Sequence, residues 1–133
     1  MADSTPELML AIVAKLKADA GVGAIAGDRI YDRVPESVTY PFVGFGFRSG
    51  EPWEAQLVNG WNALMTINIW SRNYGSVEAE NLSKAVYKAL HDVALSLSTQ
   101  TFGFGKLVTQ DTQPQGDGIT TLIRQRWEFI TTD

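Results

Sequence analysis

Residues 61–71 alternate between two sets of side chains, and this alternation most limits how the chain can fold. Ala63, Met65, Ile67 and Ile69 lie on one side of an extended strand, and Leu64, Thr66, Asn68 and Trp70 lie on the other. A sheet with one solvated face shows polar residues on that face, whereas here both sets contain large apolar side chains. We therefore expect a strand whose two faces are both partly covered.

Two segments show the apolar spacing of helices. The first is expected to begin at Ser4, which has capping-box spacing to Glu7, and to end at Gly21 and Gly23. Its apolar stripe consists of Leu8, Ile12 and Leu16, with Met9 and Val13 beside them. This stripe predicts packing against a core.

The second helix is expected to follow a turn at residues 72–75. Ser76 is its candidate N-cap, and the helix should continue to about Leu95. Glu78 and Glu80 would lie in the first turn, where carboxylates favour the positive end of the helix dipole. The apolar positions Leu82, Val86, Leu90, Val93 and Leu97 step by three and four residues. They predict that this helix packs on the sheet.

Four further segments have strand patterns: residues 29–34, 41–47, 102–112 and 119–131. The first is closed by Pro35 and is expected at a sheet edge. In the second, Val43, Phe45 and Phe47 are expected to share one face. In the last, Thr121, Ile123, Gln125, Trp127 and Phe129 face one way, whereas Leu122, Arg124, Arg126 and Glu128 face the other. One side of this strand should be largely core and the other largely wet.

The order of these elements predicts the fold class. Residues 113–118 contain Gly-Asp-Gly, a sequence that strongly favours a turn, so the last two strands should pair as a hairpin. We expect an α+β fold with two helices packed on one face of a mainly antiparallel four- to five-stranded sheet. A length of 133 residues fits one domain that spans residues 1–133.

Residues 48–60 are interpreted as a hairpin connection or projecting loop because they contain Gly50, Pro52 and Gly60. This segment would expose Trp53 between Glu51 and Glu54. An exposed tryptophan is more often an interface anchor than a stability element. Glu51, Trp53 and Glu54 are therefore candidate interface residues, and the alternative is that Trp53 folds back over the sheet edge.

The residues give little support for catalysis or for metal binding. There is no cysteine, and His91 is the single imidazole, expected as a solvated helix residue. Carboxylate pairs such as Asp28 and Asp32 lack a second cluster that would build a metal site, so no catalytic residue, metal or cofactor is expected. The N-terminus lacks a basic targeting region and the apolar runs are short, which favours synthesis in the cytoplasm without a membrane anchor.

Five strings stand out for their order and spacing: GDRIYDRVP at residues 27–35, YPFV at 40–43, LMTINIWSR at 64–72, the helix from Glu78 to Asp92, and Asp117-Gly118 with Arg126. Together they resemble a family of small tail-completion proteins of tailed bacteriophages, prophages and gene transfer agents, similar to tail terminators. The likeness covers nearly the whole chain. The segment at residues 48–60 departs from the pattern with its own acidic, tryptophan-containing sequence.

The resemblance implies an α+β subunit that forms a ring, with six copies expected, on the head-proximal end of the tail tube in the virion, after assembly in the host cytoplasm. Its partners would be further copies of itself, the tail tube protein and a neck or head-tail connector protein. A head-tail adaptor in the neck is one alternative, and a small hydrolase or nucleotide-binding enzyme is another.

A net charge of −4 argues against a protein that holds nucleic acid by neutralising phosphates. DNA is therefore expected to pass through such a ring without specific binding, along a channel wall that carries carboxylates. Asp111 and Asp117 are the candidate channel-lining residues, with Glu51 and Glu54 as further candidates.

Overall fold

Four long strands, each of 13 to 15 residues, dominate the fold. A computed structural model describes residues 3–73 and 75–133, so Tyr74, in the expected turn at residues 72–75, lies outside the described residues. The order along the chain is α1 (Thr5–Ala18), α2 (Ala20–Ala26), β1 (Ile30–Tyr31), β2 (Phe42–Ala55), β3 (Val58–Arg72), α3 (Val77–Leu90), β4 (Thr101–Pro114) and β5 (Thr120–Thr132).

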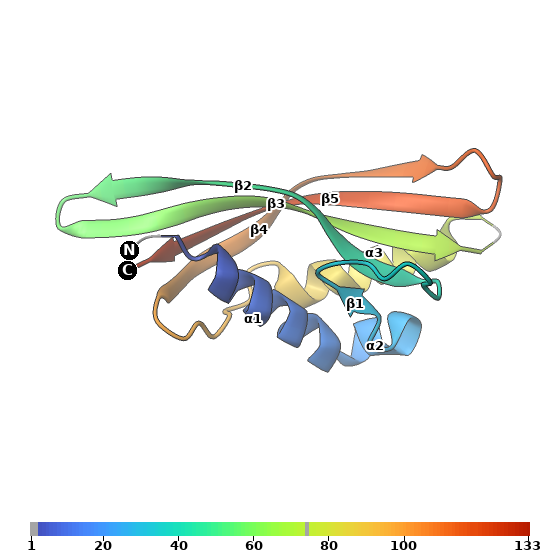
Figure 1. The fold of residues 1–133 in the computed structure, drawn as a ribbon, viewed down its shortest axis with the longest axis horizontal. Coiled ribbons are helices and arrows are strands. Elements are labelled where there is room, and N and C mark those ends of the chain that lie inside the picture. The colour runs from blue at the N-terminus through green and yellow to red at the C-terminus, as the bar shows by residue number, and fades with distance from the viewer. Residues whose placement is uncertain (1–2, 74) are drawn as a thin grey trace.

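The strands form one five-stranded sheet with the order β1-β2-β3-β5-β4. The short β1 runs parallel to β2, and the pairs β2–β3, β3–β5 and β4–β5 are antiparallel. The helices lie on one face of the sheet, and the β2–β3 and β4–β5 hairpins point to opposite ends of the molecule (Figure 1). The expected α+β class is confirmed, and the described residues contain three helices instead of two and one parallel pairing.

The first helical region breaks at Asp19 rather than at the glycines. Asp19 has an extended backbone with φ −76° and ψ 125°, which ends α1, and its carboxylate accepts a hydrogen bond of 2.9 Å from the backbone N–H of Val22. This is the geometry of an N-cap, so α2 begins directly after it. The prediction that Gly21 and Gly23 end the helix is wrong because both lie inside α2.

The expected capping box of α1 does not form. Ser4 is at the N-cap position but makes no capping bond, and its buried hydroxyl instead accepts from the Thr131 hydroxyl at 2.7 Å. Glu7 accepts from the backbone N–H and the hydroxyl of Thr99, both at 2.6 Å. Hydrogen bonds from Ser98 and Thr99 lower the pKa of Glu7. These two side chains therefore tie α1 to β5 and to the segment before β4.

The helix α3 ends at Leu90, five residues earlier than expected. Its N-cap residue Ser76 makes no capping bond either. His91 and Asp92 leave the helical conformation, with ψ 120° at His91 and φ 56° at Asp92, and the N–H of Asp92 donates to the Gly105 carbonyl on β4 at 3.0 Å. The pairing with β4 competes with helix continuation, which local spacing alone does not reveal. Leu95 is still buried, but from a loop.

The core lies between the helices and the sheet. The stripe expected for the second helix is confirmed only as far as Leu90, because Val93 and Leu97 lie beyond the end of α3 and are partly buried. The fully buried side chains of the expected stripes are Leu8, Ile12 and Leu16 from α1, Leu82, Val86 and Leu90 from α3, Ile67 and Ile69 from β3, and Ile123, Trp127 and Phe129 from β5. Each such side chain contributes about 1.5–3 kcal/mol by leaving water. The large polar side chain of Gln125 is fully buried beside them.

Gln125 connects α3 to β4 and β5. Its amide nitrogen donates to the Ser83 carbonyl at 3.0 Å and to the side-chain oxygen of Gln110 at 2.9 Å. Its amide oxygen accepts from the indole N–H of Trp127 at 3.0 Å. Because a buried amide without partners is costly, this network explains how a polar side chain can lie in the core.

Candidate interaction surfaces

Residues 48–60 belong to a regular hairpin, which agrees with their interpretation as a hairpin connection, whereas the alternative of a projecting loop is wrong. Ala55 pairs with Val58, which leaves Gln56 and Leu57 as a two-residue turn. Pro52 fits in β2 because β1 pairs only with residues 43 and 44, and the outer edge beyond them needs no donor. Because glycine and proline are typical of loops, the sequence alone does not indicate strands in this segment.

Two tryptophans cover two glycines of this hairpin. Trp53 lies opposite Gly60, and a Cβ atom on Gly60 would be 2.3 Å from the ring of Trp53. A Cβ atom on Gly50 would be 2.4 Å from Nε1 of Trp61. Gly60 and Trp61 are neighbours on β3, so the two rings pack on opposite faces of the hairpin.

Trp53 is therefore half-buried, and the expectation that it is exposed is wrong. The contact with Gly60 supports the alternative that Trp53 folds over the sheet. Within the described part of the chain, its indole N–H is buried without a hydrogen-bond partner. Trp53 thus fixes the shape of the hairpin.

The end of the β2–β3 hairpin is acidic and partly apolar. Glu51 and Glu54 are exposed, the Leu57 side chain is fully exposed and Val58 is 42% exposed. No lysine or arginine occurs between residues 49 and 71. We call residues 51–58 the acidic tip.

The β4–β5 hairpin carries the other two candidate carboxylates. Asp117 accepts hydrogen bonds from the backbone N–H groups of Ile119 at 3.0 Å and Thr120 at 2.8 Å, and from the Thr120 hydroxyl. The bonds from Thr120 and Ile119, with the nearby Arg72 guanidinium, lower the pKa of Asp117 to about 2. Asp117 therefore shapes the turn, which confirms the turn predicted from Gly-Asp-Gly.

The structure does not bring the four candidate carboxylates together. Asp111 is exposed on β4, opposite Arg124 in the register, and Asp117 lies in the following turn. Glu51 and Glu54 lie on the other hairpin, at the opposite end of the molecule (Figure 1). Two separate acidic ends are the result.

The face of the sheet that the helices leave uncovered contains a concave area lined by Phe47, Thr66, Asn68, Arg124 and Arg126, with a volume of about 420 Å³. We call this area the arginine patch. The expectation that Phe47 shares a face with Val43 and Phe45 is wrong, because an irregularity in the pairing between Phe45 and Arg48 shifts the alternation. Phe47 is 72% exposed as a result.

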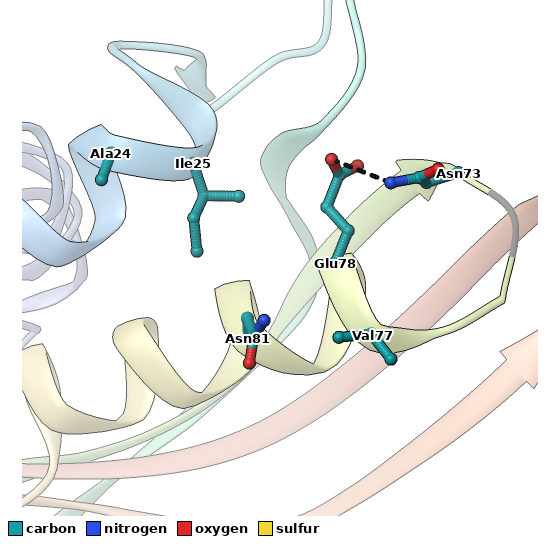
Figure 2. A pocket seen from close by; sticks show the side chains of 6 residues that line it. All are labelled: Ala24, Ile25, Asn73, Val77, Glu78 and Asn81. Atoms are coloured by element: carbon teal, nitrogen blue, oxygen red, sulfur yellow. Dashed lines mark hydrogen bonds between the residues drawn. The ribbon is translucent and has the colours of Figure 1, made fainter.

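A second hollow, of about 380 Å³, lies between α2 and the start of α3 (Figure 2). Its one charged lining residue, Glu78, accepts from the Ser71 hydroxyl at 2.7 Å and from the Asn73 amide at 3.5 Å. The carboxylate thus anchors the start of α3 to the end of β3. These bonds give Glu78 a structural role.

His91 is not the solvated helix residue that was expected. Its ring stacks on Tyr87 with centroids 4.6 Å apart, and Nδ1 accepts from the backbone N–H of Leu107 at 3.2 Å.

The carboxylate pair Asp28 and Asp32 was considered above as a possible metal-binding pair, and Asp32 forms an ion pair with Arg48 at 2.9 Å. Residues 3–73 and 75–133 contain no cluster of three or more possible metal ligands. In the same residues, no helix is long and apolar enough to cross a membrane.

The whole architecture has a counterpart among solved structures. A chain from the "Virion of native gene transfer agent (GTA) particle" matches with a TM-score of 0.90 at 19% sequence identity, over 100% of both chains. A search of curated protein sequences returns no match. The fold therefore defines a class: small α+β proteins whose fold also occurs in a gene transfer agent particle.

The family follows from the sequence itself. The family model described as "Tail completion protein gp17" matches residues 10–131. The chain belongs to the tail completion protein gp17 family, which confirms the resemblance noted from the residues. It is a structural protein of a phage-type tail and virion, and this family is not an enzyme family.

Proposed function

We propose that this protein is a tail terminator that forms a ring of six copies at the head-proximal end of the tail tube. The ring stops polymerisation of the tube and provides the surface for head-tail joining. The observation that carries this proposal is the presence of two unlike surfaces on one small subunit, the acidic tip and the uncovered face of the sheet. Contacts between unlike surfaces of identical subunits produce rings when the rotation closes.

The proposed partners are other copies of the chain, the tail tube protein and a neck or connector protein. Glu51, Trp53 and Glu54 belong to an interface in this proposal, with Trp53 holding the hairpin in shape and the two carboxylates in contact with the partner. The ring assembles in the host cytoplasm and remains in the virion. Family membership supports a place in the tail.

DNA passes through the ring without specific binding in this proposal. Because the two hairpins point to opposite ends, a subunit whose long axis lies across the ring presents one hairpin to the channel (Figure 1). We assign this position to the β4–β5 hairpin, with Asp111 and Asp117 in the wall. A charge of −4 on each chain supports a repelling surface. Tight, salt-sensitive binding of duplex DNA by the isolated protein would contradict this assignment.

Deletion of the gene for this protein separates a terminator from a head-tail adaptor. Without a terminator, tubes grow beyond their normal length and stay unattached to heads, whereas loss of an adaptor leaves tails of normal length that fail to join. Electron micrographs of particles from the deletion strain measure both properties. A three-dimensional reconstruction of the complete particle then gives the copy number and position.

A further inference from the structure

The arginine patch carries two positive charges that form no ion pair in the described residues, and the carboxylate beside them in the register is Asp111, opposite Arg124. In the described residues, neither Arg124 nor Arg126 takes part in an ion pair or a hydrogen bond to a side chain. Three other cations on the sheet do have partners: Arg48 binds Asp32 at 2.9 Å, Arg72 donates to Thr120 at 3.1 Å, and Lys106 lies 3.9 Å from Glu128. The patch therefore favours a negatively charged partner.

The surroundings of these arginines include exposed apolar side chains and one buried side-chain oxygen that lacks a hydrogen-bond donor. Phe47 and Leu64 on the same face of the sheet are 72% and 43% exposed. The side-chain oxygen of Asn68, which lines the hollow, is buried and has no hydrogen-bond partner in the described chain. Arginine and aromatic side chains are the residues most enriched at the centres of protein interfaces.

We propose that the arginine patch of one copy receives the acidic tip of a neighbouring copy. The inference rests on the proposed ring. Glu51 and Glu54 lie on opposite faces of the hairpin, so each face of the tip presents one carboxylate that can bind a guanidinium group. The turn places the fully exposed Leu57 where Phe47 and Leu64 offer apolar surface. The two surfaces are thus opposite in charge, and both expose apolar side chains.

The tip of a subunit does not reach its own patch. Glu51 pairs with Asn62, whereas the patch lies beside Thr66 and Asn68, four to six residues further along β3. At about 3.3 Å per residue, this separation is roughly 13–20 Å along the sheet. The hairpin is held straight by its strand pairing and by the ring of Trp53 over Gly60, so contact requires a second copy.

Duplex DNA fits the patch less well. Binding to DNA depends on rows of cations that neutralise many phosphates, and this face offers two free arginines beside exposed Phe47 and Leu64. The net charge of −4 opposes binding further. An acidic, partly apolar protein segment matches all of these features.

Charge reversal in the particle tests the contact. We expect the double variant Glu51→Arg/Glu54→Arg to lose incorporation into particles by about tenfold or more, because like charges then face each other. The double variant Arg124→Glu/Arg126→Glu should lose as much, and the variant with all four changes should recover most of it. Lys84→Glu, on the exposed side of α3, is the matched control with no expected loss. Melting curves of each purified variant show whether it folds.

Disulfide trapping tests the same contact by distance. The chain has no cysteine, so Gln56→Cys combined with Phe47→Cys introduces one thiol at the tip and one at the patch. Oxidised particles should yield a ladder of covalent oligomers, and either single variant should not. Absence of cross-links, covalent species that stop at dimers, or protection of the Arg124 and Arg126 patch by duplex DNA would overturn the proposal.

The two proposals fail in different ways. Overlong tails in the deletion strain, together with normal incorporation of both charge-reversed variants, would retain the terminator and reject the tip-to-patch contact. A covalent ladder in particles, together with normal tail length in the deletion strain, would retain the contact and reject the terminator. Rescue by the four-residue reversal supports the contact whichever role the ring has.

Discussion

Replacement of Gln125 by methionine should destabilise the fold although it adds an apolar side chain to the core. Gln125 is fully buried and accepts the indole N–H of Trp127, which is itself fully buried. After Gln125→Met this N–H has no acceptor, which costs about 1–3 kcal/mol. Loss of the bond to the Ser83 carbonyl adds about 0.5–1 kcal/mol, since that carbonyl retains its place in the helix.

The net effect of Gln125→Met is a loss of about 2–3 kcal/mol in the free energy of unfolding. Urea denaturation followed by circular dichroism measures it, with an unchanged m-value as the sign that only stability has changed. Gln56→Met is the matched control, because the Gln56 side chain is exposed in the turn of the β2–β3 hairpin and its replacement should cost about 0.5 kcal/mol or less.

A double-mutant cycle identifies the cause of this loss. In the Trp127→Phe background, where no indole N–H remains, Gln125→Met should cost clearly less than in the original protein. The reasoning is refuted if Gln125→Met lies within about 0.5 kcal/mol of the original protein, or if its cost is the same in both backgrounds.

Three further changes test other contacts. Gly105→Ala should lower stability by about 1–3 kcal/mol because its Cβ would lie 2.5 Å from the Phe129 ring, whereas Gly116→Ala, with no atom within 4 Å, should change the melting curve little. Gly23→Ala inside α2 meets no atom within 4 Å and should raise stability by about 0.5–1 kcal/mol in the same assay. Asp117→Asn should be less stable at pH 7, and the difference should vanish as the pH falls from about 4 to about 2, because the folded protein lowers the pKa of this carboxyl; a gap independent of pH would contradict this.

Sequence patterns predicted the elements whose periodicity extends over several turns or pleats. The alternation in residues 61–71 and the stripe through Leu8, Ile12 and Leu16 were read correctly, because burial imposes the period of the element directly on the sequence. The break at Asp19 and the early end of α3 were missed. Both depend on a hydrogen bond that competes with helix continuation, and such competition leaves no periodic trace.

The candidate interface was predicted in composition but not in shape. Gly50 and Gly60 looked like loop residues, and their pairing with tryptophans depends on strand register, which one strand alone does not reveal. Arg124 and Arg126 were assigned correctly to the wetter side of their strand. Their partnership with Phe47 depends on the irregularity after Phe45, which the sequence does not mark.

The two tryptophan–glycine contacts divide the β2–β3 hairpin into a part that tolerates little change and a part that tolerates much. A side chain at Gly60 would meet both the Trp53 ring and the Thr131 carbonyl at 2.2 Å, so the body of the hairpin accepts few substitutions. Glu51, Glu54 and Leu57 are exposed, and the hairpin does not need them to keep its shape. The exposed residues that contact a partner can therefore change between related proteins while the hairpin keeps its shape.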